Sequence, residues 1–309
     1  MRVQISDHQD KSQALKEALA HYGHEIVYTD PEVLLIDFDG PVAHYPKTIE
    51  RAYERGAAVF LYSHGAMPLT CWDGIWTPSD KVSGFLAQTP GQKAVMEAYH
   101  YPHPVHVIGW HYTDQYPFEQ TTGKRVLFAP WHPQGTGWLI PEGRAANARM
   151  YKLLTQIPGI NLTIRHAGNL ADNNLPFDPV VTKYERSNKS LDTSVESILN
   201  YDIIIGYGTF AYLSVALGKP TVMYGQNCVP YDGYSAETCA YVKHWDWYSH
   251  LMHYPHDGDV DNVWQLMAVM DKACKEEATE WRREFIGEQF KEREFCDLLE
   301  KLVREVDYA

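Results

Sequence analysis

The chain has 309 residues, 45% of them hydrophobic and 22% charged, with a formal net charge of −13. This length and composition are typical of a globular protein of two medium domains, and so negative a charge disfavours nucleic acid and anionic membrane surfaces as partners. No apolar run is long enough to span a membrane and residues 1–12 carry no export signal, so we expect a cytoplasmic protein without an integral membrane segment.

The five cysteines give no sign of a disulfide framework or a structural zinc site. Their number is odd, they are scattered between Cys71 and Cys296, and no two of them form a C-x-x-C pair. We therefore expect reduced and mostly buried thiols.

Short apolar runs alternate with helical patterns along most of the chain. In the first part, strands are predicted at residues 2–5, 33–37, 57–62 and 105–109, and helices at residues 12–21 and 48–55. In the second part, strands are predicted at residues 125–129, 161–165 and 221–224, and helices at residues 263–275 and 279–304. Such alternation predicts an α/β protein whose parallel sheets are covered by helices.

A polar, proline-bearing segment at residues 114–123 separates these two parts and marks the predicted domain boundary. We expect a Rossmann-like domain at residues 1–115 and a second one at residues 124–278. The last segment, residues 279–309, is predicted to be an amphipathic helix that crosses back to the first domain. Two such domains are expected to hold ligands in a central cleft, at the carboxyl ends of their strands.

The most informative stretch is residues 202–224, DIIIGYGTFAYLSVALGKPTVMY. Three isoleucines predict a buried strand, and Gly206 and Gly208 bracket Tyr207 where the backbone must turn. Thr209 is the expected N-cap of a helix that presses an apolar stripe onto the sheet and ends at Gly218. The free N–H groups at the start of such a helix suit a phosphate, although an ordinary strand-helix-strand unit without a ligand has the same pattern.

Four motifs in order support a family resemblance. They are a strand ending in His-Gly at residues 61–65, Val-Ile-Gly-Trp at 107–110, Leu-Phe-Ala-Pro at 127–130, and the stretch at 202–224. This series resembles the two-domain glycosyltransferases of GT-B fold, most closely those similar to CDP-glycerol glycerophosphotransferases and more remotely UDP-GlcNAc 2-epimerases. The resemblance implies an acceptor-side first domain and a second domain that binds a nucleotide donor.

By this resemblance, His64 of the His-Gly motif is the general base. An imidazole that titrates near neutrality, at the carboxyl end of a strand and beside a glycine, can accept the proton of an acceptor hydroxyl. The alternative is that His64 only bonds the loop backbone.

The resemblance places the donor diphosphate at Tyr207, Gly208 and Thr209. Arg165 and His166 end a preceding strand on the same sheet edge, where a guanidinium can bind phosphate oxygens. The alternative is that both residues make only surface contacts.

The Gly-bearing loop at residues 134–137 adds Thr136 as a candidate donor contact, with a surface turn as the alternative. His132 stands near the place of a basic residue in the family.

One departure from the family concerns the nucleotide. The helix position at which the related transferases and epimerases carry an acid falls on Leu213, and Tyr212 stands where epimerases carry a second acid. Leucine cannot accept hydrogen bonds from ribose hydroxyls, so the ribose must be bound by another group. The absence of this acid favours a single displacement assisted by His64, with inversion at a sugar carbon.

No metal site is expected, because Asp37-Phe38-Asp39 lies in the first domain and is interpreted as a loop cap rather than a metal-binding D-x-D motif. Trp245 and Trp247 lie in an aromatic-rich segment, where they either stack on a sugar or base or anchor an insertion to the core.

The sequence therefore predicts a metal-independent, inverting glycosyltransferase that uses a nucleotide-sugar donor as co-substrate, with UDP-sugars the leading choice on family frequency, and no other cofactor. The acceptor is an unidentified hydroxyl. The alternatives are a nucleotide-sugar epimerase or hydrolase of the same fold, and a two-lobed ligand-binding protein without catalytic activity.

Overall fold

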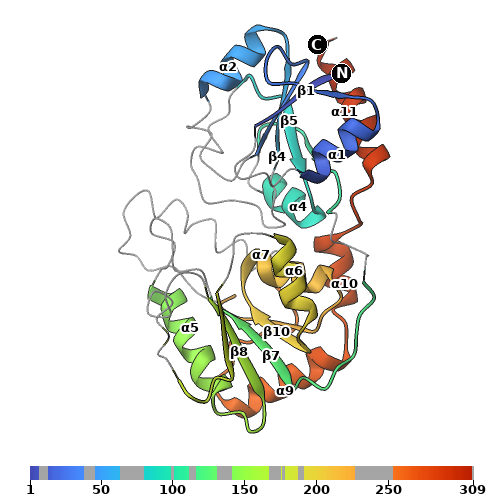
Figure 1. The fold of residues 1–309 in the computed structure, drawn as a ribbon. Helices are drawn as coiled ribbons and strands as arrows, with labels where there is room; N and C mark the ends of the chain where they lie inside the picture. The colour runs from blue at the N-terminus through green and yellow to red at the C-terminus, as the bar shows by residue number, and fades with distance from the viewer. Residues whose placement is uncertain are drawn as a thin grey trace. The chain divides into compact units, whose positions relative to one another are not determined.

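The computed structural model describes residues 1–6, 13–37, 46–62, 80–98, 101–110, 116–130, 141–166, 175, 178–186, 191–226 and 253–307. The chain divides into two compact units (Figure 1). Unit 1 comprises Met1–Thr113 and Phe285–Ala309, and unit 2 comprises Asp114–Glu284. Within the described residues, no helix is both long and apolar enough to cross a lipid bilayer.

Unit 1 is built on a parallel sheet with strand order β2-β1-β3-β4-β5-β6. Its strands are β1 (Arg2–Ser6), β2 (Glu25–Ile26), β3 (Val33–Asp37), β4 (Ala58–Tyr62), β5 (Gly84–Ala87) and β6 (Val105–Val107). Its helices are α1 (Gln13–His21), α2 (Pro46–Glu54), α4 (Pro90–Ala98) and α11 (Glu292–Asp307). The central strands β3, β4 and β5 of this sheet are buried on both faces at residues 33–36, 58–62 and 84–87, which explains why these segments are apolar runs rather than alternating ones.

The two faces of the unit 1 sheet belong to two separate cores. Leu34 and Val59 contribute to a core with α2 and α4, whereas their neighbours Leu35 and Phe60 contribute to one with α1 and α11. This division follows from the strand geometry, because successive side chains point to opposite faces.

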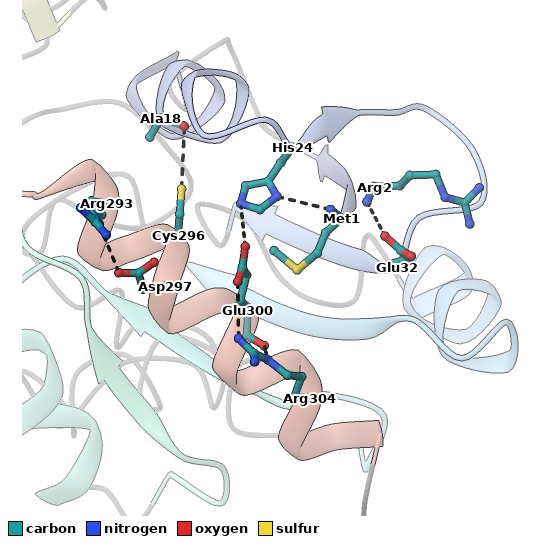
Figure 2. Close-up of polar contacts among 10 residues, drawn as sticks. All are labelled: Met1, Arg2, Ala18, His24, Glu32, Arg293, Cys296, Asp297, Glu300 and Arg304. Carbon is teal, nitrogen blue, oxygen red and sulfur yellow. Dashed lines mark hydrogen bonds and ion pairs between the residues drawn. The ribbon is translucent and has the colours of Figure 1, made fainter.

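Helix α11 is the element of unit 1 that comes from the end of the chain, and Figure 1 shows it in red beside the dark-blue α1. Phe295, Leu299 and Leu302 recur at helical spacing and are buried in the core that α1 shares. Figure 2 shows the polar contacts along this helix, among them the Cys296 thiol, whose Sγ lies 3.8 Å from the carbonyl oxygen of Ala18.

The prediction of one continuous helix at residues 279–304 is wrong. The segment forms a short α10 (Thr279–Trp281) and one π-helical turn, η3 (Arg282–Ile286), and α11 begins only at Glu292. Gly287 interrupts the helix with a φ of +76°, and a Cβ there would lie 2.5 Å from Cδ of Pro90. Helical periodicity could not reveal this break, because it is imposed by a close contact with a distant part of the chain.

Unit 2 has a second parallel sheet, with strand order β11-β10-β7-β8-β9. Its strands are β7 (Arg125–Ala129), β8 (Asn161–His166), β9 (Lys183–Arg186), β10 (Ile203–Gly206) and β11 (Thr221–Met223). Its longer helices are α5 (Pro141–Leu154), α6 (Leu191–Leu199), α7 (Gly208–Ala216) and α9 (Val263–Lys275). The bounds of α9 are those predicted, and the side chain of Asn262 caps it by accepting from the N–H groups of Trp264 and Gln265.

The two faces of the unit 2 sheet are also different, because successive side chains along each strand point to opposite faces. Phe128, Ile164 and Ile205 pack into a core with α5 and α9. Helices α6 and α7 contact each other, and α7 packs on β10 and β11. Because Thr163 and Arg165 alternate with Leu162 and Ile164, they face away from the α5 and α9 core.

A buried histidine beside α11 predicts a pH dependence for the stability of unit 1. His24 is 8% exposed, and its ring lies between the amino group of Met1, at 3.3 Å, and the carboxylate of Glu300, at 3.7 Å (Figure 2). Burial and the Met1 ammonium lower the pKa of His24, and Glu300 opposes them.

We expect wild-type protein to lose more stability than His24→Asn as the pH falls from about 7.5 to 5.5. The reason is that the unfolded chain binds a proton on this ring near pH 6.5, whereas the folded chain binds it only at lower pH. Urea denaturation of both proteins across this range measures the difference. A difference in unfolding free energy that is independent of pH would contradict the prediction.

Candidate functional site

The candidate site lies at the carboxyl edge of the unit 2 sheet, where β10 turns into α7. Tyr207 is extended, with φ −140° and ψ 155°, and the helix begins directly afterwards at Gly208. Gly208 has a φ of +69°, which a residue with a Cβ adopts only under strain. This left-handed residue lets the chain pass from strand to helix within two residues.

The prediction that Thr209 caps α7 is wrong, because Thr209 lies inside the helix and the N-cap residue is Tyr207. Tyr207 makes no side-chain capping hydrogen bond to the helix. The first N–H groups of an α-helix have no partner within the helix, and here the N-cap side chain does not supply one. The start of α7 is therefore suited to an anion.

Arg165 lies beside this helix start. The residue is 6% exposed, and its guanidinium carbon is 4.6 Å from the centre of the Phe210 ring, in the first turn of α7. One Nη donates to Oγ of Ser194 on α6, at 3.1 Å. Arg165 is thus held between α6 and α7, close to the beginning of α7.

Arg165 differs from the other buried charged groups of its unit. Among the described Asp, Glu, Lys and Arg residues, Arg165, Asp202 and Lys219 are buried. Asp202 pairs with Arg125 at 2.6 Å, and Lys219 pairs with Glu119 at 2.8 Å. Within the described part of the chain, Arg165 has no carboxylate within ion-pairing distance.

Burial lowers the pKa of Arg165, an effect that the nearby Glu185 carboxylate opposes. An arginine still stays protonated at neutral pH, because its ordinary pKa lies far above neutrality. A buried positive charge without a counter-ion destabilises a fold unless something negative approaches it. Because Arg165 lies beside the start of α7, its guanidinium and the N–H groups of the helix are two positive elements that can bind one anion.

His166 follows Arg165 in β8, and its register partner in β9 is Arg186. Consecutive strand residues point to opposite faces, so the strand geometry puts Arg165 alone of this pair on the α6 and α7 face. The predicted contact of His166 with a phosphate stays a prediction.

Leu213 and Tyr212 of α7 are core residues of unit 2. Leu213 is completely buried, and Tyr212 is buried with its ring stacked on that of Trp281 at 5.5 Å. Desolvation raises the pKa of the Tyr212 hydroxyl. The position where the related families carry an acid is therefore occupied here by core residues.

Several predicted site residues lie outside the part of the chain that the structure describes: His64, His132, Thr136, Trp245 and Trp247. Phe38 and Asp39 lie outside it as well. Among the described residues, no group of three or more His, Cys, Asp or Glu side chains is placed to hold a metal ion.

Sequence reasoning missed Ser194 as a partner of Arg165, and it assigned Phe210 only to the packing stripe of α7. No local pattern identifies either contact. A signal was present in β8, where Thr163 and Arg165 interrupt an apolar strand on alternate positions and so mark one polar face.

No protein-family model matches the chain, and no curated protein sequence is significantly similar to it. Solved structures do resemble it. The spinosyn rhamnosyltransferase SpnG, complexed with thymidine diphosphate, is 14% identical, covers 96% of this chain and 100% of its own, and has a TM-score of 0.56. A variant of the wall teichoic acid polymerase TagF is 12% identical, covers 100% and 90%, and has a TM-score of 0.55.

The glycotransferase of kitacinnamycin is 12% identical, covers 97% of this chain and 98% of its own, and has a TM-score of 0.53. At these identities the likeness establishes the fold. The chain has the GT-B fold of these glycosyltransferases, with two parallel sheets flanked by helices, and the predicted fold class is confirmed.

The turn before α7 yields a paired substitution test. We expect Gly208→Ala to destabilise the protein by about 1–2 kcal/mol, because its φ of +69° strains any residue with a Cβ. Gly206→Ala is the control, since its Cβ would lie at ordinary contact distances of 3.7 Å from the Ala129 carbonyl oxygen and Ala211 Cβ. Urea denaturation compares them, and an equal loss of stability in both variants would contradict the assignment of strain to Gly208.

Proposed function

We propose that this protein is a glycosyltransferase that moves a sugar or sugar-like group from a nucleoside diphosphate donor to an acceptor hydroxyl. The observation that carries the proposal is the buried Arg165, which has no carboxylate partner in the described residues and lies beside the uncapped start of α7. The fold supports it, because the similarly folded proteins described above are glycosyltransferases or a cell-wall polymerase.

A diphosphate suits this arrangement better than a single carboxylate does. Its several oxygens can accept from the N–H groups at the start of α7 and from a guanidinium at the same time. One similarly folded protein is described as complexed with thymidine diphosphate, a ligand of this chemical class.

In the proposed reaction, the acceptor oxygen attacks the anomeric carbon while His64 takes the hydroxyl proton. The bond from that carbon to the diphosphate oxygen breaks, and the nucleoside diphosphate leaves with the bonding electrons. Arg165 and the N–H groups of α7 stabilise the charge that develops on the leaving group. This single displacement inverts the sugar carbon, and the two positive elements perform the neutralisation for which other transferases use a divalent cation.

The burial of Leu213 and Tyr212 bears on the competing epimerase activity. The Leu213 position carries an acid in both the transferases and the epimerases that the sequence resembles, whereas the Tyr212 position carries a second acid in the epimerases, and here both are buried packing residues of unit 2. We therefore favour transfer over epimerisation. Incubation with donor alone separates the two, because an epimerase forms a sugar isomer without an acceptor.

Arg165→Met tests the donor site. We expect this variant to be at least as stable as wild type without ligand, because it removes a buried charge that forms no ion pair with the described residues. We also expect it to bind nucleoside diphosphates about 10- to 100-fold more weakly, since it loses charge-assisted hydrogen bonds. Thermal shift and calorimetry with UDP, GDP, CDP and dTDP measure both effects, with UDP expected to bind best.

The control is Arg149→Met, which removes an exposed arginine that pairs with Asp261 and should leave nucleotide binding unchanged. The donor-site proposal fails if no nucleoside diphosphate stabilises wild type at millimolar concentration.

His64→Ala tests the proposed base. We expect kcat to fall by about 10²- to 10⁴-fold while donor affinity stays near that of wild type, because the base acts on the acceptor. His21→Ala, at an exposed histidine of α1, is the control for general effects of losing an imidazole. Unchanged turnover in the His64 variant would remove this residue from the mechanism.

A further inference from the structure

Arg165 and Glu185 are neighbours that do not form the ion pair expected of them. They are direct register partners on the parallel strands β8 and β9, so their side chains leave the same face of the sheet from backbones about 5 Å apart. Burial lowers the pKa of Arg165, and the Glu185 carboxylate acts electrostatically against this effect. Yet in the described part of the chain Arg165 donates to Ser194 and not to Glu185.

The Glu185 carboxylate is occupied by other donors. Oε1 accepts from Nζ of Lys183 at 2.6 Å and from the hydroxyl of Tyr201 at 2.8 Å. Oε2 accepts from Oγ of Ser197 on α6, at 2.9 Å. Together these donors hold the pKa of Glu185 below its ordinary value against the opposing effect of burial.

Ser197 differs from the other two donors in the carboxylate oxygen that it binds. Of the three, it alone bonds Oε2, whereas Oε1 has the other two. If Ser197 lost its hydroxyl, Oε2 would become an acceptor close to a buried cation that lacks a counter-ion in the described residues. A carboxylate and a guanidinium in that situation attract each other strongly, because the surroundings are partly desolvated.

We propose that Ser197, Tyr201 and Lys183 restrain Glu185 so that it does not pair with Arg165, which keeps the guanidinium available for a diphosphate. Glu185 is thus a positioning residue that acts through Arg165 and does not itself touch the ligand. This inference rests on the proposed function to the extent that Arg165 binds a diphosphate.

Ser197→Ala is the direct test, with inorganic pyrophosphate as the probe in calorimetry. We expect pyrophosphate to bind about fivefold more weakly, the effect of one partly solvated ion pair that the ligand must displace. Ala is a better helix former than Ser, so this change in the half-buried face of α6 should not unfold the protein. Tyr201→Phe, which frees a bond of Oε1, is expected to act in the same direction.

The decisive measurement is a rescue. Glu185→Gln removes the competing charge and retains an amide oxygen for the same donors, so the double variant Ser197→Ala with Glu185→Gln should bind pyrophosphate as well as wild type does. Glu196→Gln, at the exposed neighbouring position of α6, is the matched control and should restore nothing in the Ser197→Ala protein. If Ser197 had only a structural role, its loss would weaken pyrophosphate binding to the same extent with and without the E185Q change.

Two results would overturn the inference: unchanged pyrophosphate affinity in Ser197→Ala, or a loss that E185Q does not reverse. A crystal structure of Ser197→Ala with a Glu185 oxygen within hydrogen-bond distance of the Arg165 guanidinium would support it. Failure of the proposed donor site has a different signature, since wild type and Arg165→Met would then bind pyrophosphate equally or not at all.

Discussion

The central strands of both sheets are buried on both faces, and this constraint decides where polar chemistry can be placed. In the central strands, residues 33–36 of β3, 58–62 of β4, 126–129 of β7 and 203–206 of β10 are buried. A charged or polar group within them must find a partner, because water cannot supply one. The ends of the strands, where the chain leaves the sheet, can hold polar side chains, and ligands of open α/β sheets bind at the carboxyl ends.

Arg165 is a charged residue that lies within a strand and is nevertheless buried. It is the next-to-last residue of β8, and among the described residues it contacts a hydroxyl and an aromatic ring and forms no ion pair with a carboxylate. The paired Asp202 and Lys219 show that unit 2 elsewhere neutralises its buried charges. The exception coincides with the start of α7, and a negatively charged ligand, as proposed, would compensate both the Arg165 guanidinium and the positive end of this helix.

The sequence predicted several elements that depend on local pattern, such as α9 with its bounds, but it predicted neither the buried strand β5 nor the helices α4, α5 and α6. Two further errors arose where a distant contact or an exposed edge determined the structure. The break at Gly287 is set by its approach to Pro90. No strand was predicted at β9, KYER, because a partly exposed edge strand is not selected for apolar residues. Without that strand, Glu185 could not be connected with its register partner Arg165 or with the site.

By itself, the sequence determined that this is an α/β protein of two Rossmann-like domains related in pattern to GT-B transferases, and it located the turn that suits a phosphate. These features follow from hydrophobic periodicity and glycine positions, which act over a few residues. Only the tertiary structure decided that Arg165 is buried without a carboxylate partner among the described residues, and that three donors occupy Glu185. Such partners are brought together by sheet register and helix packing, which no local stretch of sequence specifies.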